Sequence, residues 1–199
     1  MKKRNGFTVM AKLIGLVRPL AGYMLLAIIM GLLGHLAASF ITIFGGFAVL
    51  DLLGQNGGIK TGTVFVCVGV FALVRGILRY AEQSCNHFIA FKLLALIRDK
   101  VFRALRRLAP AKLEGRDKGD LISVITSDIE LLEVFYAHTI SPAAIAALFT
   151  LILCLFIGHY HWALGLLALA AYAVVGLVIP IVTSRRSGDL GLRFRNESG

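Results

Sequence analysis

Four long apolar stretches set the limits on what this chain of 199 residues can fold into. Each is longer than the ~20 residues that a helix needs to cross ~30 Å of hydrocarbon. Hydrophobic residues make up 58% of the sequence and charged residues only 16%, which is not the balance of a soluble domain. Backbone groups in lipid must be hydrogen-bonded within their own segment, so the stretches are expected to be helices. The sequence therefore predicts an all-α membrane protein with spans at about 20–50, 62–91, 134–158 and 160–184.

The net charge of +10 is distributed unevenly along the chain. Basic residues gather before the first span, between Lys92 and Lys118, and after the fourth span, whereas the opposite loops contain a single lysine. Basic loops remain in the cytoplasm, so both chain ends are assigned to that side. No basic and aromatic pattern typical of nucleic-acid binding occurs. The sequence predicts a multi-pass protein of the cytoplasmic membrane, with its N-terminus inside and no nucleic acid as a partner.

Helical periodicity also extends beyond the spans. Within the N-terminal segment 1–18, apolar and basic residues over 7–18 have the pattern of an amphipathic helix that would lie on the membrane surface. From Thr63 to Leu108 there is no proline, and a helix of that length would measure ~70 Å, about twice the hydrocarbon thickness. Pro110 ends it, and a return helix leads into the third span. The sequence thus predicts a cytoplasmic helical hairpin over 92–133, which could be a simple two-helix coiled coil or a coupling arm.

A row of polar and ionisable side chains lies inside the second span. Spacings of three and four residues place them on one helix face, where Arg79 and Glu82 could form an ion pair. Ionisable groups at membrane depth usually face a bundle interior or a wet cavity. The interpretations that stay open are a cationic cavity wall that binds an anionic substrate, a polar clamp between helices, and side chains that snorkel to the cytoplasmic interface. The candidate cavity residues are Arg75, Arg79, Glu82, Gln83 and Asn86, with His87 beside them.

Other histidines and prolines in the spans are weaker candidates. His35 and His138 are interpreted as packed or hydrogen-bonded residues, and the run 159–162 as an aromatic belt rather than a metal site. Pro142 and Pro180 predict helix kinks. The sequence predicts no metal site and no catalytic residues, because no nucleophile is paired with a base.

The block Gly119-Asp120-Leu121-Ile122-Ser123, followed by Ser127-Asp128-Ile129, resembles the type 1 transmembrane domain of ABC exporters. Within that superfamily, Arg79-Tyr80-Ala81-Glu82-Gln83 through Asn86-His87, together with the run 135–142, resembles the CydC/CydD branch. Members of that branch are half-transporters linked to cytochrome bd assembly and thiol-reductant export. The resemblance extends over roughly residues 10–195.

The resemblance implies further parts and partners. A complete member has six spans and an ATPase domain, whereas this sequence contains no G-x-x-x-x-G-K-[ST] motif. An N-terminal fragment, or one part of a split transporter, is therefore expected for residues 19–199. Implied partners are an ABC nucleotide-binding domain that binds ATP and a second half-transporter, either a copy or a different chain. Residues that would contact the nucleotide-binding domain, unless they form a solvated turn, are Leu113, Arg116, Asp117 and Lys118.

Function and cofactor follow from the same resemblance. Some CydC-type proteins bind haem through a histidine at the matching place, so His87 is a candidate haem ligand. The implied function is ATP-driven export of a thiol compound or a haem-linked substrate. The alternatives are the membrane domain of a generic ABC multidrug or lipid exporter, and a non-transporting membrane scaffold or binding protein that uses the hairpin as a docking arm.

Overall fold

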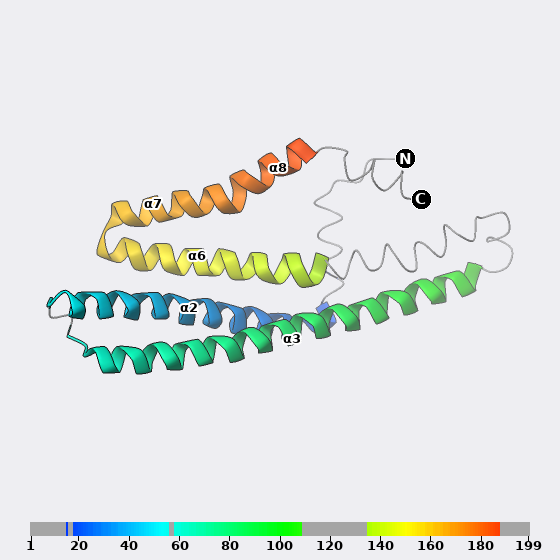
Figure 1. The fold of residues 1–199 in the computed structure, drawn as a ribbon. Coiled ribbons are helices and arrows are strands. Elements are labelled where there is room, and N and C mark those ends of the chain that lie inside the picture. The colour runs from blue at the N-terminus through cyan, green and yellow to red at the C-terminus, as the bar shows by residue number, and fades with distance from the viewer. Residues whose placement is uncertain (1–14, 16–17, 56–57, 109–134, 188–199) are drawn as a thin grey trace. The chain divides into compact units, whose positions relative to one another are not determined.

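The computed structural model describes residues 15, 18–55, 58–108 and 135–187, and every regular element in these ranges is helical (Figure 1). This confirms the all-α fold class. By length and composition, four helical stretches in the described ranges could cross a membrane: Arg18–Leu52, Thr61–Arg107, His138–Tyr160 and Trp162–Ser187. The elements are η1 (Arg18–Leu20), α2 (Ala21–Leu52), α3 (Thr61–Leu108), η3 (Tyr136–Ile140), α6 (Ser141–Tyr160), α7 (Trp162–Ala173), η4 (Val174–Val178) and α8 (Ile179–Ser187).

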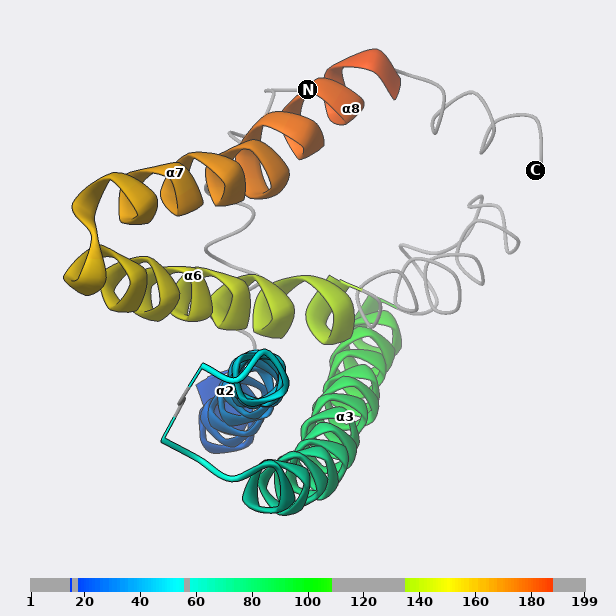
Figure 2. The ribbon, with the colours of Figure 1, turned by 60° about the vertical axis from the view of Figure 1, so that its left-hand side comes forward.

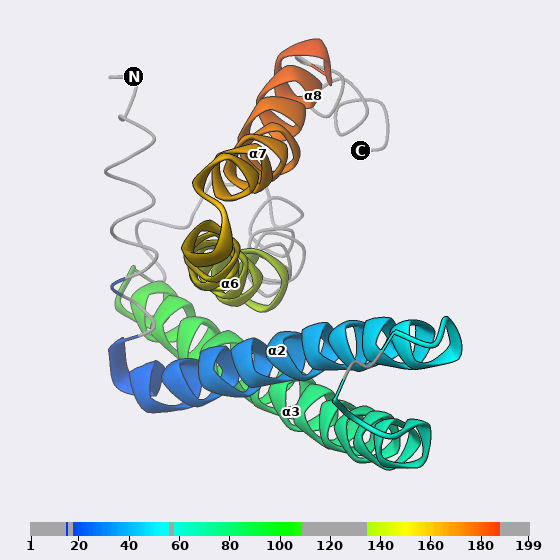
Figure 3. The same cartoon turned by 90° about the vertical axis from the view of Figure 1, so that its left-hand side faces the viewer.

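The chain forms two compact units, residues 1–146 and residues 147–199, and each is described by itself. In the first unit, α2 and α3 are consecutive helices that pack against each other and cross, as Figure 3 shows. Between helices in lipid, small side chains let the backbones approach closely. The buried residues of α2 fit this rule, since all of them are small: Ala27, Gly31, Gly34 and Ala37.

The connection from α2 to α3 is closed by hydrogen bonds. The backbone N–H groups of Gly54 and Gln55 donate to the carbonyls of Asp51 and Leu50, both at 3.0 Å, which forms a Schellman motif at the end of α2. Gly54 has the positive φ of 72° that this motif requires. The Asp51 carboxylate accepts hydrogen bonds from the backbone N–H of Thr61, at 3.2 Å, and from the Thr61 hydroxyl. One carboxylate at the end of α2 therefore caps the first turn of α3.

Helix α3 has 48 residues and, at ~1.5 Å a residue, is about 72 Å long. The long helix expected from Thr63 to Leu108 is therefore present. Past the middle of α3, an apolar cluster packs against the start of α2, and Phe135 and Ile140 pack beside it; its buried members are Leu20, Ile89, Leu93 and Ile97. The expected amphipathic segment before residue 15, the hairpin tip and the return limb over 109–134 lie outside the described residues.

The second unit contains another helical hairpin, in which α7 runs back beside α6 (Figure 2). Only His161 separates α6 from α7, and its extended backbone, with φ −155° and ψ 114°, makes the turn. The two helices approach so closely that a Cβ on Gly165 would lie 2.7 Å from Gly158 Cα and 3.1 Å from the Cys154 carbonyl oxygen. Glycine at 165 is therefore required for this tight turn.

The two prolines expected to kink their helices each follow a π-helical segment. Segment η3 ends two residues before Pro142, and η4 ends two residues before Pro180. Proline has no N–H to donate, and its ring clashes with the carbonyl four residues earlier. A π-helical turn widens the helix at that place and removes the clash. The irregularity predicted at the two prolines is thus present as a π-helical segment before each of them.

Candidate functional site

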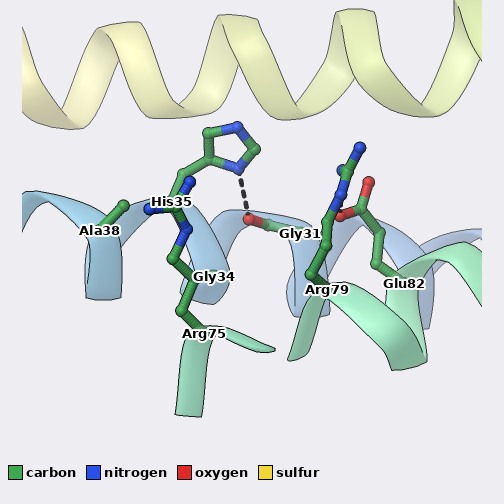
Figure 4. A pocket seen from close by; sticks show the side chains of 7 residues that line it. All are labelled: Gly31, Gly34, His35, Ala38, Arg75, Arg79 and Glu82. Atoms are coloured by element: carbon green, nitrogen blue, oxygen red, sulfur yellow. Dashed lines mark hydrogen bonds and ion pairs between the residues drawn. The ribbon is translucent and has the colours of Figure 1, made fainter. Parts of the chain in front are cut away.

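A cavity of about 250 Å³ lies between α2 and α3 in the first unit, and Figure 4 shows the residues that line it. One stripe of side chains from each helix forms its walls, with spacings of three and four residues that keep each stripe on one face. The lining residues are Gly31, Gly34, His35 and Ala38 from α2, and Arg75, Arg79 and Glu82 from α3.

The wall contributed by α2 is made of small residues and one imidazole. Because Gly31, Gly34 and Ala38 have little or no side chain, they leave space that the long side chains of α3 can enter. His35 Nδ1 lies 2.8 Å from the Gly31 carbonyl oxygen and donates to it, which fixes the orientation of the ring (Figure 4). The α2 wall thus consists of residues with little or no side chain and one polar ring, that of His35.

The wall contributed by α3 holds an ion pair. Arg79 donates from a terminal guanidinium nitrogen to the Glu82 carboxylate at 2.7 Å, and the side chains are 57% and 2% exposed. A Cβ on Gly31 would lie 3.0 Å from Glu82 Cδ and would also meet Ile145. Glycine at 31 therefore creates the space in which the Glu82 carboxyl group lies against α2. Glu82 is buried by α2, while its partner Arg79 stays accessible.

The cavity carries more positive than negative charge. Arg75 and Arg79 contribute two guanidinium groups, and Glu82 is the single carboxylate in the lining. At ~1.5 Å a residue, Arg75 lies about 21 Å and Glu82 about 31 Å along α3 from Thr61. Counted from Thr61, Arg75 falls within the ~30 Å of a hydrocarbon layer and Glu82 at its far edge, and ionisable groups in such segments usually face a bundle interior or a wet cavity. Two arginines against one carboxylate favour an anionic ligand.

Three of the five predicted cavity residues line the cavity: Arg75, Arg79 and Glu82. Gln83 is half-buried and is not among the lining residues. Asn86 lies one turn beyond Glu82 on the buried face of α3 and is 3% exposed. Within the described residues its Nδ2 has no hydrogen-bond partner. Of the two neighbours, Glu82 is therefore the one that faces the cavity and Gln83 is not. Asn86 lies in the layer next to the cavity.

His87 lies on a different face of α3 from the cavity. Its side chain is exposed, and its ring lies 6.1 Å from that of Phe91, centroid to centroid. It is not among the residues that line the cavity. With about 250 Å³, the cavity is smaller than the ~300–1,000 Å³ of pockets that enclose drug-sized ligands. The cavity therefore does not fit a haem bound through His87.

His35 is the residue whose importance the sequence interpretation underestimated. It was interpreted as an ordinary packed histidine, and the structure places it in the cavity opposite the arginines. The pattern that could have found it is the row of small residues around it, Gly31, Gly34 and Ala38, which predicts a close helix contact on that face.

The predicted coupling residues Leu113, Arg116, Asp117 and Lys118 lie outside the described residues. Within the described ranges no group of three or more His, Cys, Asp or Glu side chains could hold a metal ion. The run 159–162 lies at the bend between α6 and α7, and its side chains are exposed.

The class of protein that this geometry defines is a helical membrane domain with one helix longer than a span and a polar cavity between two of its helices. Residues 24–188 match the family described as ABC transporter transmembrane region, and the chain belongs to that family.

Several curated proteins are similar to the chain. A probable ABC transporter ATP-binding/permease protein of Haemophilus influenzae is 47% identical over 99% of this chain and 36% of its own length. The glutathione/L-cysteine transport system ATP-binding/permease protein CydD of Bacillus subtilis is 26% identical over 79% of this chain and 28% of its own length. An ATP-dependent lipid A-core flippase of Shewanella denitrificans is 25% identical over 92% and 33%, respectively. The chain thus spans about a third of the length of these relatives.

Proposed function

We propose that this chain is the substrate-binding part of the membrane domain of an ATP-driven exporter. The observation that carries the proposal is the cavity between two helices long and apolar enough to span a membrane, with Arg75, Arg79 and His35 on its walls. A lipid-facing helix gains nothing from such residues, because charged side chains in the hydrocarbon region are destabilising. Membership of the ABC transporter transmembrane family supports transport as the purpose of the cavity.

The ligand of this cavity is an anion of modest size, bound through a carboxylate or phosphate group. Arginine presents a planar set of donors that matches either group in a bidentate arrangement. The name of the Bacillus relative includes glutathione and cysteine, and that of the Shewanella relative lipid A-core. Glutathione carries carboxylates, so a thiol peptide suits both the cavity and the CydC/CydD resemblance. A generic lipid or multidrug exporter is the alternative within transport.

Partners and topology follow from the same proposal. An ABC nucleotide-binding domain would bind and hydrolyse ATP, and a second half-transporter, either a copy or a different chain, would complete the pathway. The charge distribution supports a cytoplasmic membrane location with the N-terminus inside. Residues 92–133 would form the arm that reaches the nucleotide-binding domain, with Leu113, Arg116, Asp117 and Lys118 as contacts.

The test is transport by the complete transporter that contains this chain. Inside-out vesicles expose the cytoplasmic face, so ATP is added to the external medium, and the uptake of radiolabelled glutathione and cysteine is measured with ATP and with a non-hydrolysable analogue. Uptake that depends on ATP and falls at least tenfold in Arg79→Gln is the expected result, because the variant removes a charge-assisted contact to the anion. The matched control is Arg98→Gln, an arginine on α3 outside the cavity lining.

Other outcomes of the same assay separate the alternatives. Uptake of a fluorescent phospholipid instead of the thiols identifies a lipid exporter. A complex that takes up neither class and hydrolyses no ATP would support the non-transporting scaffold and contradict the proposal.

A further inference from the structure

We propose that Glu82 is a built-in counter-anion of the cavity, which an anionic ligand displaces from Arg79 onto a second set of donors that includes Asn86. The proposal rests on the anion-binding cavity proposed above and adds a mechanism by which the empty and occupied states differ. It assigns a role to Asn86, which does not line the cavity, and to the buried hydroxyl of Ser141.

The first step is that Glu82 already occupies the place where a ligand would bind. It accepts from Arg79 at 2.7 Å and lines the same small cavity as Arg75. A ligand carboxylate or phosphate that binds Arg79 therefore brings a second negative charge next to Glu82. Like charges at this separation repel strongly where water is scarce. Ligand binding must therefore weaken the pair of Glu82 with Arg79.

The second step is that the layer next to Glu82 contains polar groups without partners. Asn86, four residues along α3, is 3% exposed, and Ser141 at the start of α6 is 0% exposed. Asn86 Nδ2 and Ser141 Oγ have no hydrogen-bond partner among the residues that the structure describes. Buried donors are normally satisfied, so two unpaired groups in one unit need an explanation.

The third step places these groups in the same layer. Gly31 is the point where Glu82 of α3 and Ile145 of α6 both approach α2. Asn86 is one turn from Glu82, and Ser141 is one turn from Ile145. Side chains four residues apart lie on the same helix face, ~5–6 Å apart at Cβ. A rotation of the Glu82 side chain is therefore sufficient to exchange the Arg79 donor for the Asn86 amide.

The cavity without a ligand and the cavity with a ligand then differ in which polar groups are hydrogen-bonded. Without a ligand, Glu82 neutralises Arg79 and leaves Asn86 Nδ2 unpaired. With a ligand, the incoming anion takes Arg79, and Glu82 accepts hydrogen bonds from Asn86 and Ser141.

Ligand-induced infrared difference spectroscopy tests the displacement on the purified chain in phosphatidylcholine nanodiscs. The probe in one arm is inorganic phosphate, and in the other it is phosphatidic acid included in the disc, which separates a soluble anion from a lipid headgroup as the source. We expect either probe to shift a carboxylate stretching band that is missing from the Glu82→Gln spectrum.

Binding affinities for the same probes provide the second measurement. Glu82→Gln should bind about tenfold more tightly, because the ligand no longer competes with a resident carboxylate. Asn86→Leu should bind several-fold more weakly, because the displaced carboxylate loses its donor. The matched control is Gln83→Leu, which removes a neighbouring amide that does not line the cavity and should leave affinity unchanged.

The outcomes separate this inference from the proposed function. Anion binding without a shift of the Glu82 band, or with equal affinity in Asn86→Leu and wild type, overturns the displacement and leaves the anion cavity standing. No binding of either probe to wild type or to Glu82→Gln overturns both.

Discussion

The two helical hairpins, α2 with α3 and α6 with α7, both bring two helices into contact, but different residues make the contact. Both have small residues where the two helices touch, which is along the α2–α3 contact in the first hairpin and only near the bend in the second. In the α6–α7 hairpin the contact is backbone against backbone at Gly158 and Gly165. In the α2–α3 hairpin the space left by Gly31 is filled by the end of a charged side chain, Glu82.

This difference separates a structural use of glycine from a functional one. At Gly158 and Gly165 the backbones of α6 and α7 touch, the pocket beside this contact has an apolar lining that includes Leu155 and Leu166, and the described part of the hairpin holds no Asp, Glu, Lys or Arg before Arg185. The α2–α3 contact leaves a cavity and places an ion pair in it. Glycine therefore borders an apolar pocket in one hairpin and a charged cavity in the other.

The largest expected effect is on the α6–α7 hairpin. In Gly165→Ala the new Cβ would lie 2.7 Å from Gly158 Cα, and backbone cannot move aside without opening the turn. We expect a loss of about 3 kcal/mol in the free energy of unfolding, seen as a lower melting temperature in detergent. In Gly158→Ala the Cβ would lie at an ordinary 3.8 Å from Gly165 Cα, so little change is expected. Equal effects of the two substitutions would contradict a backbone-limited contact.

The next effect concerns the ion pair in the α2–α3 hairpin. Arg79→Gln leaves the Glu82 carboxylate buried without its cation, which should destabilise the chain by about 2 kcal/mol. Thermal unfolding of the single and double variants gives the coupling energy. The double variant Arg79→Gln/Glu82→Gln should recover most of the loss, because no buried charge remains. If the double variant is as unstable as Arg79→Gln, the pair does not hold the carboxylate.

A smaller effect is expected at Gly31. In Gly31→Ala the new Cβ meets Ile145 and Glu82, but these are the flexible ends of side chains, so a loss of about 1 kcal/mol is expected. Adding Ile145→Val should restore part of the melting temperature by making room. Gly45→Ala, where nothing lies within 4 Å, is the control. A loss as large as that of Gly165→Ala would erase the difference between the two hairpins.

The smallest effect is expected at the closed end of the α2–α3 hairpin. Asp51→Ala removes the acceptor of the Thr61 backbone and hydroxyl groups, and loss of this cap at the exposed end of the hairpin should cost about 0.5 kcal/mol. Hydrogen exchange at the Thr61 amide should accelerate, while exchange near Gly165 stays the same. Gln55→Ala, at an exposed position of the same connection, is the control. Unchanged exchange at Thr61 would show that the cap is not maintained in solution.

The sequence predicted the helices well because the signals for a spanning helix are local. Apolar runs and the absence of proline were sufficient for four long helices and for the extension of α3 past the membrane. The rotation of α3 about its own axis was harder to predict than its length, since neighbours such as Glu82 and Gln83 are only one position apart on the helix. Which of them faces inward depends on the partner helix, and the position of His87 away from the cavity has the same cause.

The partner helix did contain the missing information. Ala27, Gly31, Gly34 and Ala37 mark the contact face of α2, and His35 beside them follows from that face. The π-helical form of the segments before Pro142 and Pro180 could not be predicted, because proline removes a hydrogen bond without determining how the helix adjusts.

Helix α3 is continuous from the cavity to Leu108, so a small tilt of the helix at the cavity is a large displacement at its far end. Between Glu82 and Leu108 the helix continues for 26 residues, about 39 Å, so a tilt of about 10° at Glu82 displaces Leu108 by about 7 Å. A displacement of that size would exceed the ~5.4 Å pitch of a helical turn. Distance measurements between spin labels near Leu108 with and without an anion would therefore show whether α3 tilts when the cavity is occupied.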